Sequence, residues 1–145
     1  MKNLIKTVAV VLFIAITTSS FASGSYNPGK NYSADAVISN YIETTTMGNP
    51  ENVENLFTDN FFQTVSTPAK VITHSKKPFI DYVKSQKGYV QNCQTSHTII
   101  ERNDNCAIAK ITLTYQNFTK VEYVTVCSDG EVWKVSQVVT SYPKK

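Results

Sequence analysis

Residues that build metal sites and nucleic-acid interfaces are scarce in this sequence. It has only two histidines and three cysteines among 145 residues, and the histidines belong to no Cys, His or carboxylate pattern of the kind that binds metal. The net charge of +3 depends on four lysines at the two ends of the chain: Lys2, Lys6, Lys144 and Lys145. The part between them is close to neutral and lacks the clustered basic face of nucleic-acid-binding proteins. We therefore expect no metal, no cofactor and no nucleic-acid partner.

Long apolar runs are also missing, except for one at the start. Two lysines precede the apolar residues 8–16, and the small-residue pattern Ser-Phe-Ala follows at 20–22. This order is typical of a secretory signal peptide, and the run is shorter than the roughly 20 apolar residues that cross a membrane. We therefore expect a periplasmic or secreted protein that contacts no membrane after cleavage. The expected divisions are a signal peptide at 1–22, a flexible leader at 23–32 and one domain at 33–142.

The spacing of apolar residues divides this domain into a helical part and a β part. Helical spacing predicts three helices, at 33–48, from 49 to about 58, and at 75–88. From Tyr89 onward the period is two, which predicts an antiparallel meander of strands near 90–102, 105–115, 118–127 and 132–141. A weak alternation over 60–74 indicates one or two short strands. Helices followed by strands indicate an α+β domain with the helices packed on one face of a curved sheet.

Two stretches of the chain carry a family resemblance. "YIETTTMGNPENVENLFTDNFFQTVS", which begins at Tyr41, and "YVTVCSDGEVWKVSQVV", which begins at Tyr123, resemble the two ends of the nuclear transport factor 2-like superfamily. That superfamily includes SnoaL-like polyketide cyclases and ketosteroid isomerase, and the most similar branch is the small bacterial proteins called "putative lumazine-binding". The resemblance implies a cone-shaped fold, a pocket between helices and a mainly antiparallel sheet, and frequently a homodimer through the outer face of the sheet. Function varies within the superfamily, so the fold does not decide it.

The register of the last strands decides what such a pocket contains. Symmetric turns at 116–117 and 128–131 set Ile111 opposite Glu122 and place Glu122 beside Gln137. The more apolar face of the sheet, which the helices should cover, then carries Ala107, Ala109, Ile111, Leu113, Val124, Val126, Trp133, Val135 and Val139. A slip of one residue would instead turn Glu122 to solvent and leave it an ordinary strand residue.

Glu122 is the candidate catalytic residue. An apolar cavity disfavours the charged carboxylate, so its pKa should rise and it would serve as a general base or hydrogen-bond donor near neutral pH. The isomerases and cyclases that the chain resembles use a pocket acid in this way. No second acid is placed to help it. For the aromatic residues and His74, a structural role is the alternative to ligand contact. The predicted ligand-binding residues are Tyr41, Phe57, Phe61, His74, Tyr82, Glu122, Trp133 and Gln137.

The same register also places the cysteines. Cys106 lies opposite Cys127, on the face away from Glu122, whereas Cys93 has no cysteine across from it. In an oxidising compartment a disulfide between the first two is expected, and it would contribute about 3 kcal/mol by loop closure. Three unpaired thiols are the alternative, because cross-strand geometry does not always permit the bond.

Three kinds of function are compatible with these observations. The first is a binding protein that holds a small apolar or aromatic molecule in the cone, oriented by Glu122 and Gln137. The second is a protein-interaction module that uses the outer sheet face. The third is a cofactor-independent isomerase, dehydratase or cyclase with Glu122 as proton shuttle and a tyrosine or His74 as oxyanion donor. We rank them in that order.

Overall fold

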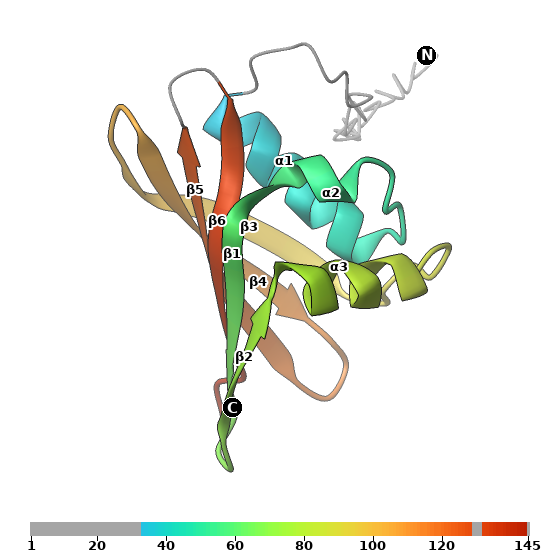
Figure 1. The fold of residues 1–145 in the computed structure, drawn as a ribbon. Helices are drawn as coiled ribbons and strands as arrows, with labels where there is room; N and C mark the ends of the chain where they lie inside the picture. The colour runs from blue at the N-terminus through green and yellow to red at the C-terminus, as the bar shows by residue number, and fades with distance from the viewer. Residues whose placement is uncertain (1–32, 129–131, 145) are drawn as a thin grey trace, which may run out of the picture.

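The computed structural model describes residues 33–128 and 132–144 and folds them into helices beside a single six-stranded sheet (Figure 1). The expected signal peptide at 1–22, the leader at 23–32 and the turn at 129–131 lie outside the described residues. Within the described part, no helix is both long and apolar enough to cross a membrane.

Helices and strands follow one another in the order that the sequence predicts. The helices are α1 (Ala34–Thr46), α2 (Val53–Leu56) and α3 (Lys76–Ser85). The strands are β1 (Phe57–Ser66), β2 (Val71–Ser75), β3 (Gln94–Arg102), β4 (Cys106–Thr114), β5 (Thr119–Ser128) and β6 (Trp133–Ser141). Their order across the sheet is β2-β1-β6-β5-β4-β3, and every pair is antiparallel except β1 with β6. The expected α+β class is confirmed, and the weak alternation over 60–74 corresponds to β2 and most of β1.

Local chemistry explains where α1 begins and ends. The Ser33 hydroxyl accepts a hydrogen bond from the Ala36 N–H at 3.3 Å, which caps the first turn. Two residues after the helix, Gly48 has φ +65°, a conformation that favours glycine. A Cβ at this position would lie 2.6 Å from the backbone nitrogen of Tyr89. Glycine is therefore required both to turn the chain and to let the segment before β3 pass close by.

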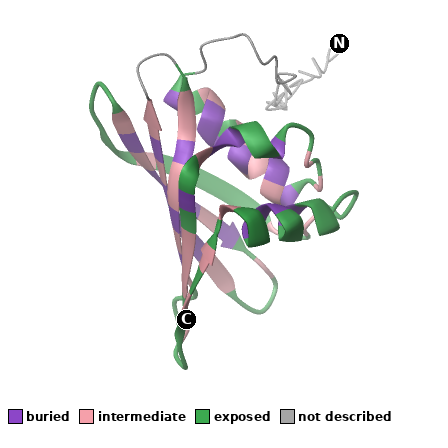
Figure 2. Ribbon diagram, viewed as in Figure 1, coloured by how far each residue is buried: buried purple, intermediate pink, exposed green. Residues whose placement is uncertain are grey.

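The hydrophobic core lies between the helices and the inner face of the sheet. All three helices lie on one side of the sheet, and their buried faces turn towards it (Figure 2). On β4 the buried positions alternate along the strand, as the period-two pattern predicts. The predicted register of β4 with β5 is confirmed, including Ile111 opposite Glu122. The inner face of these two strands carries Ala107, Ala109, Ile111, Leu113, Val124 and Val126, each at most 1% exposed.

The predicted register of β5 with β6 is wrong. Val135 pairs with Val126 rather than with Val124, and an irregularity between Thr125 and Val126 shifts the ladder beyond that point. Because Thr125 pairs with Gln137, one extra residue on β6 is accommodated there as a β-bulge. A bulge reverses which face the following side chains occupy, which symmetric turns cannot anticipate. Glu122 consequently lies opposite Thr140, while Gln137 and Val139 leave the inner face on which they were expected.

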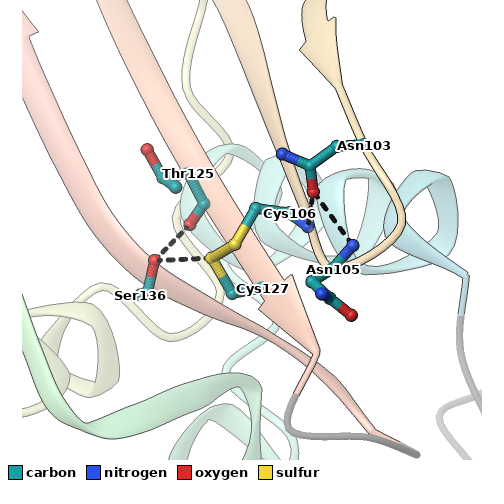
Figure 3. Close-up of a disulfide and its surroundings, with 6 residues drawn as sticks. All are labelled: Asn103, Asn105, Cys106, Thr125, Cys127 and Ser136. Carbon is teal, nitrogen blue, oxygen red and sulfur yellow. Dashed lines mark hydrogen bonds between the residues drawn. A yellow bond between two sulfur atoms is a disulfide. The ribbon is translucent and has the colours of Figure 1, made fainter.

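A disulfide joins Cys106 to Cys127 across β4 and β5, at the position where the predicted register sets them opposite each other (Figure 3). The side-chain oxygen of Asn103 accepts hydrogen bonds from the N–H groups of Asn105 and Cys106, which holds the turn before β4. Next to the bond, the Ser136 hydroxyl donates to the Thr125 carbonyl at 3.2 Å. Cys93 is a free thiol, partly buried against the core.

Candidate functional site

Glu122 lies on the inner face of β5 and is 3% exposed. The Tyr41 hydroxyl of α1 donates to its Oε2 at 3.0 Å, and the Thr140 hydroxyl of β6 donates to its Oε1 at 3.4 Å. The Lys120 ammonium lies 3.2 Å from the same Oε1. Thr140 in turn accepts a hydrogen bond from the Gln63 side chain at 3.0 Å. We call these five residues the Glu122 network.

The contacts of the Glu122 network explain how a carboxylate can be buried in the core. Its charge has a lysine partner, and both of its oxygens have hydrogen-bond or ion-pair contacts, so that burial leaves no polar atom of the carboxylate unsatisfied. Burial, and secondly the Glu122 charge, raise the pKa of Tyr41 well above its usual range, so the phenol keeps the proton that it donates. The contact ties α1 to the sheet. Because Glu122 is 3% exposed and Tyr41 is 1% exposed, a ligand would have to displace one of these contacts to reach the carboxylate.

A cavity lies elsewhere, between β1 and the start of α3. Its volume is about 750 Å³, within the range of about 300–1,000 Å³ of small-molecule sites. We call it the β1–α3 groove. Its lining combines apolar with charged and amide side chains, contributed by Glu54, Asp59, Asn60, Phe61, Phe62, Ser75, Lys76, Lys77, Ile80 and Asp81.

An irregularity in β1 shapes one wall of this groove. Phe57 pairs with Val135 of β6, and Phe62 pairs with Gln137, so five steps along β1 match only two along β6. The four residues 58–61 face the single residue 136 of β6, so this segment contains three surplus residues and leaves the regular ladder, as in a large β-bulge. Such bulges often lie next to binding sites. The buried Oγ1 of Thr58 has no hydrogen-bond partner among the described residues, which is a cost of this conformation.

Lys76, the first residue of α3, holds the bulge in place. Its ammonium donates to the Phe57 carbonyl at 3.0 Å and to Oδ1 of Asp59 at 3.3 Å. The Lys76 side chain is 23% exposed, whereas the Asp59 side chain is fully exposed. One lysine therefore joins the start of the bulge, its middle and the helix that forms the opposite wall.

Ion pairs also balance the other charges around the groove. Lys77 pairs with Asp81 one turn along α3 at 2.9 Å. Lys84 hydrogen-bonds to Glu54, and this contact lowers the pKa of that carboxyl. All three carboxylates that line the groove therefore have a lysine partner. The apolar lining consists of Phe61 and Ile80, which are almost completely buried, and Phe62, which is 39% exposed.

The structure separates most of the residues that the sequence groups into one site. Only Phe61 of that set lines the groove. Glu122 and Tyr41 form the closed network described above, and Phe57 is fully buried in the core. The remaining four are dispersed. Tyr82 is 61% exposed on α3, and Trp133 packs partly buried against the core. Gln137 of β6 pairs with Thr125 of β5, and His74 of β2 pairs with Gln63 of β1.

Sequence reasoning missed the groove residues Asp59, Asn60 and Lys76. The one signal, which concerns Asp59 and Asn60 alone, is the polar run Thr-Asp-Asn at 58–60, which interrupts the apolar residues around it. A break of this kind is compatible with a bulge, but its size depends on the pairing of β1 with β6, more than 70 residues later in the chain.

Residues 30–141 match the protein family described as "Putative lumazine-binding". The chain belongs to this family. No curated protein matches it.

Solved structures share the fold at low sequence identity. An NTF2-like protein from Silicibacter pomeroyi is 13% identical, with a TM-score of 0.63, and the match covers 75% of this chain and 92% of that one. An NTF2-like protein from Methylobacillus flagellatus is 17% identical, with a TM-score of 0.61 and coverages of 78% and 96%. A protein described as "putative ketosteroid isomerase", from Parabacteroides distasonis, is 16% identical, with a TM-score of 0.58 and coverages of 81% and 94%. The nuclear transport factor 2-like fold is thereby confirmed.

Proposed function

We propose that this protein is a secreted or periplasmic small-molecule-binding protein whose ligand lies in the β1–α3 groove. The observation that carries the proposal is a cavity of about 750 Å³ in which Phe61, Phe62 and Ile80 stand beside polar side chains. Binding sites for small molecules combine apolar walls with a few polar groups that orient the ligand. The family description supports a binding role, and the signal-like N-terminus supports export.

The lining favours a compact ligand with an apolar or aromatic body. Phe62 is the apolar residue of the groove with the most free surface, at 39% exposed, and an aromatic ligand ring can stack on it. The side-chain amide of Asn60 and the Ser75 hydroxyl supply both donors and acceptors for polar ring atoms. Lumazine, a flat heteroaromatic molecule named in the family description, is therefore the first ligand to test.

Catalysis at Glu122 has less support than binding. A general base must come within hydrogen-bond reach of its substrate, whereas this carboxylate is 3% exposed and already contacts Tyr41, Thr140 and Lys120. Binding in the groove does not require the contacts of Glu122 to break, because the groove is already open to solvent.

The test is a fluorescence titration of the protein with lumazine. Replacing Phe62 with alanine should weaken binding about five- to tenfold, because the ligand loses an aromatic surface of the groove. Tyr123→Ala is the matched control, since Tyr123 is equally exposed, at 38%, but lies on β5 outside the groove. Equal losses in both variants, or no saturable binding of lumazine at all, would contradict the proposal.

A further inference from the structure

Lys76 differs from the other lysine of the groove lining in how it is held. Its side chain is 23% exposed, against 84% for Lys77, and its hydrogen bond to the Phe57 carbonyl anchors the ammonium at the bulge. An ammonium has three donors, and the described contacts of Lys76 use two of them, on Phe57 and Asp59. The groove therefore contains an immobilised cation with capacity for a further acceptor.

The carboxylate that neutralises this cation is weakly held. The Asp59 side chain is fully exposed and lies in the bulged segment of β1. An ion pair with a solvated carboxylate is weak, because water competes for the carboxylate and salt screens the attraction. Releasing Asp59 into water would therefore cost little. The same release would leave Lys76 in place, since the Phe57 carbonyl still holds it.

We infer that the ligand of the β1–α3 groove is an aromatic carboxylic acid, whose carboxylate replaces that of Asp59 on Lys76. This inference rests on the proposed function of the groove and adds the charge of its ligand. The ring of such a ligand lies against Phe62 and its carboxylate lies at the bulge, because Phe62 and Lys76 line the same cavity. The exchange is one of equal charges: a ligand carboxylate arrives and the Asp59 carboxylate turns to solvent.

The other carboxylates of the groove do not oppose this exchange strongly. Asp81 is paired with Lys77, and Glu54 is paired with Lys84. Each therefore carries a neutralising lysine of its own, and Lys76 contributes to lowering the pKa of Glu54 only after Lys84. At Lys76, by contrast, an incoming anion can displace the exposed Asp59 carboxylate and bind the partly buried Lys76 ammonium.

The experiment compares two probes, lumazine and lumazine-6-carboxylate, on the wild-type chain. Wild type should bind the carboxylate about tenfold more tightly, as a charge-assisted hydrogen bond contributes. Asp59→Asn should raise the preference for the carboxylate over lumazine about threefold, by removing the competitor of the ligand carboxylate. Asp35→Asn is the matched control: it also removes an exposed carboxylate from an ion pair, that with Arg102, but it lies outside the groove, and both affinities should stay at wild-type values.

Lys76→Met should abolish the preference for the carboxylate, and Lys76→Arg should retain it. If Lys76→Met fails to fold, as judged by circular dichroism, the comparison of Asp59→Asn with Asp35→Asn decides. Equal binding of the two probes to wild type, or equal effects of the two aspartate variants, would overturn the inference while leaving the groove as a binding site. Binding of neither probe would overturn both.

Discussion

Two lysine–carboxylate ion pairs in this molecule have nearly equal N–O distances but different roles. Lys120 lies 3.2 Å from Glu122, and Lys76 lies 3.3 Å from Asp59. The Glu122 side chain is 4% exposed, however, whereas that of Asp59 is fully exposed. A buried pair cannot lose one member without leaving a charge in the core, and an exposed pair can. Burial, rather than distance, therefore separates a pair that holds the fold together from one that can exchange partners with a ligand.

The largest effect that would test this comparison comes from Glu122→Ala. The change leaves the Lys120 ammonium and the Tyr41 hydroxyl without their carboxylate, so we expect a loss of about 3 kcal/mol in the free energy of unfolding. The value is at the low end for buried pairs because the Lys120 side chain, at 16% exposed, still reaches water. Chemical denaturation monitored by circular dichroism measures it. A loss below about 1 kcal/mol, the range of exposed pairs, would make the two pairs equivalent.

Tyr41→Phe should have an intermediate effect. It removes one hydrogen bond to Glu122 and should cost about 1–2 kcal/mol. It should also change the pH dependence of stability. Since the pKa of Tyr41 is raised above its usual value of 10.0 in the folded protein, the unfolded chain releases this proton first as the pH rises, and stability falls above about pH 10. Wild type should therefore lose more stability than Tyr41→Phe between about pH 9 and 11. Parallel pH profiles would argue against the buried donor.

Asp59→Asn should have the smallest effect on stability, below about 1 kcal/mol, because its partner Lys76 keeps the Phe57 carbonyl and the lost pair is solvated. The same denaturation measurement applies. A loss as large as that of Glu122→Ala would mean that the exposed pair, too, is needed to hold the bulge.

The contrast between the two regions also explains what the sequence could predict. The facing of Glu122 follows from β4 and β5, which are neighbours in the chain and joined by a short turn, so period-two spacing was sufficient. Gln137 was placed wrongly because a single extra residue on β6 reverses the alternation, and no turn signal marks it. The groove was missed because it depends on how β1 pairs with β6, at the other end of the domain. Local patterns therefore predict pairing where a ladder is regular, and they fail at bulges and where distant strands meet.

The parallel pairing of β1 with β6 also has a consequence for how the molecule is made. β1 is the first strand of the domain and β6 the last, so their ladder cannot form until the last strand of the domain has been synthesised. Contacts between such distant segments carry a large loop-closure cost and form late during folding. The β3–β6 meander can assemble from neighbouring hairpins, whereas the β1–β6 ladder, and with it the wall of the groove, requires the last strand of the domain. The binding surface is thus expected to be the last part of the molecule to mature, and the first to open when the last strand is shortened.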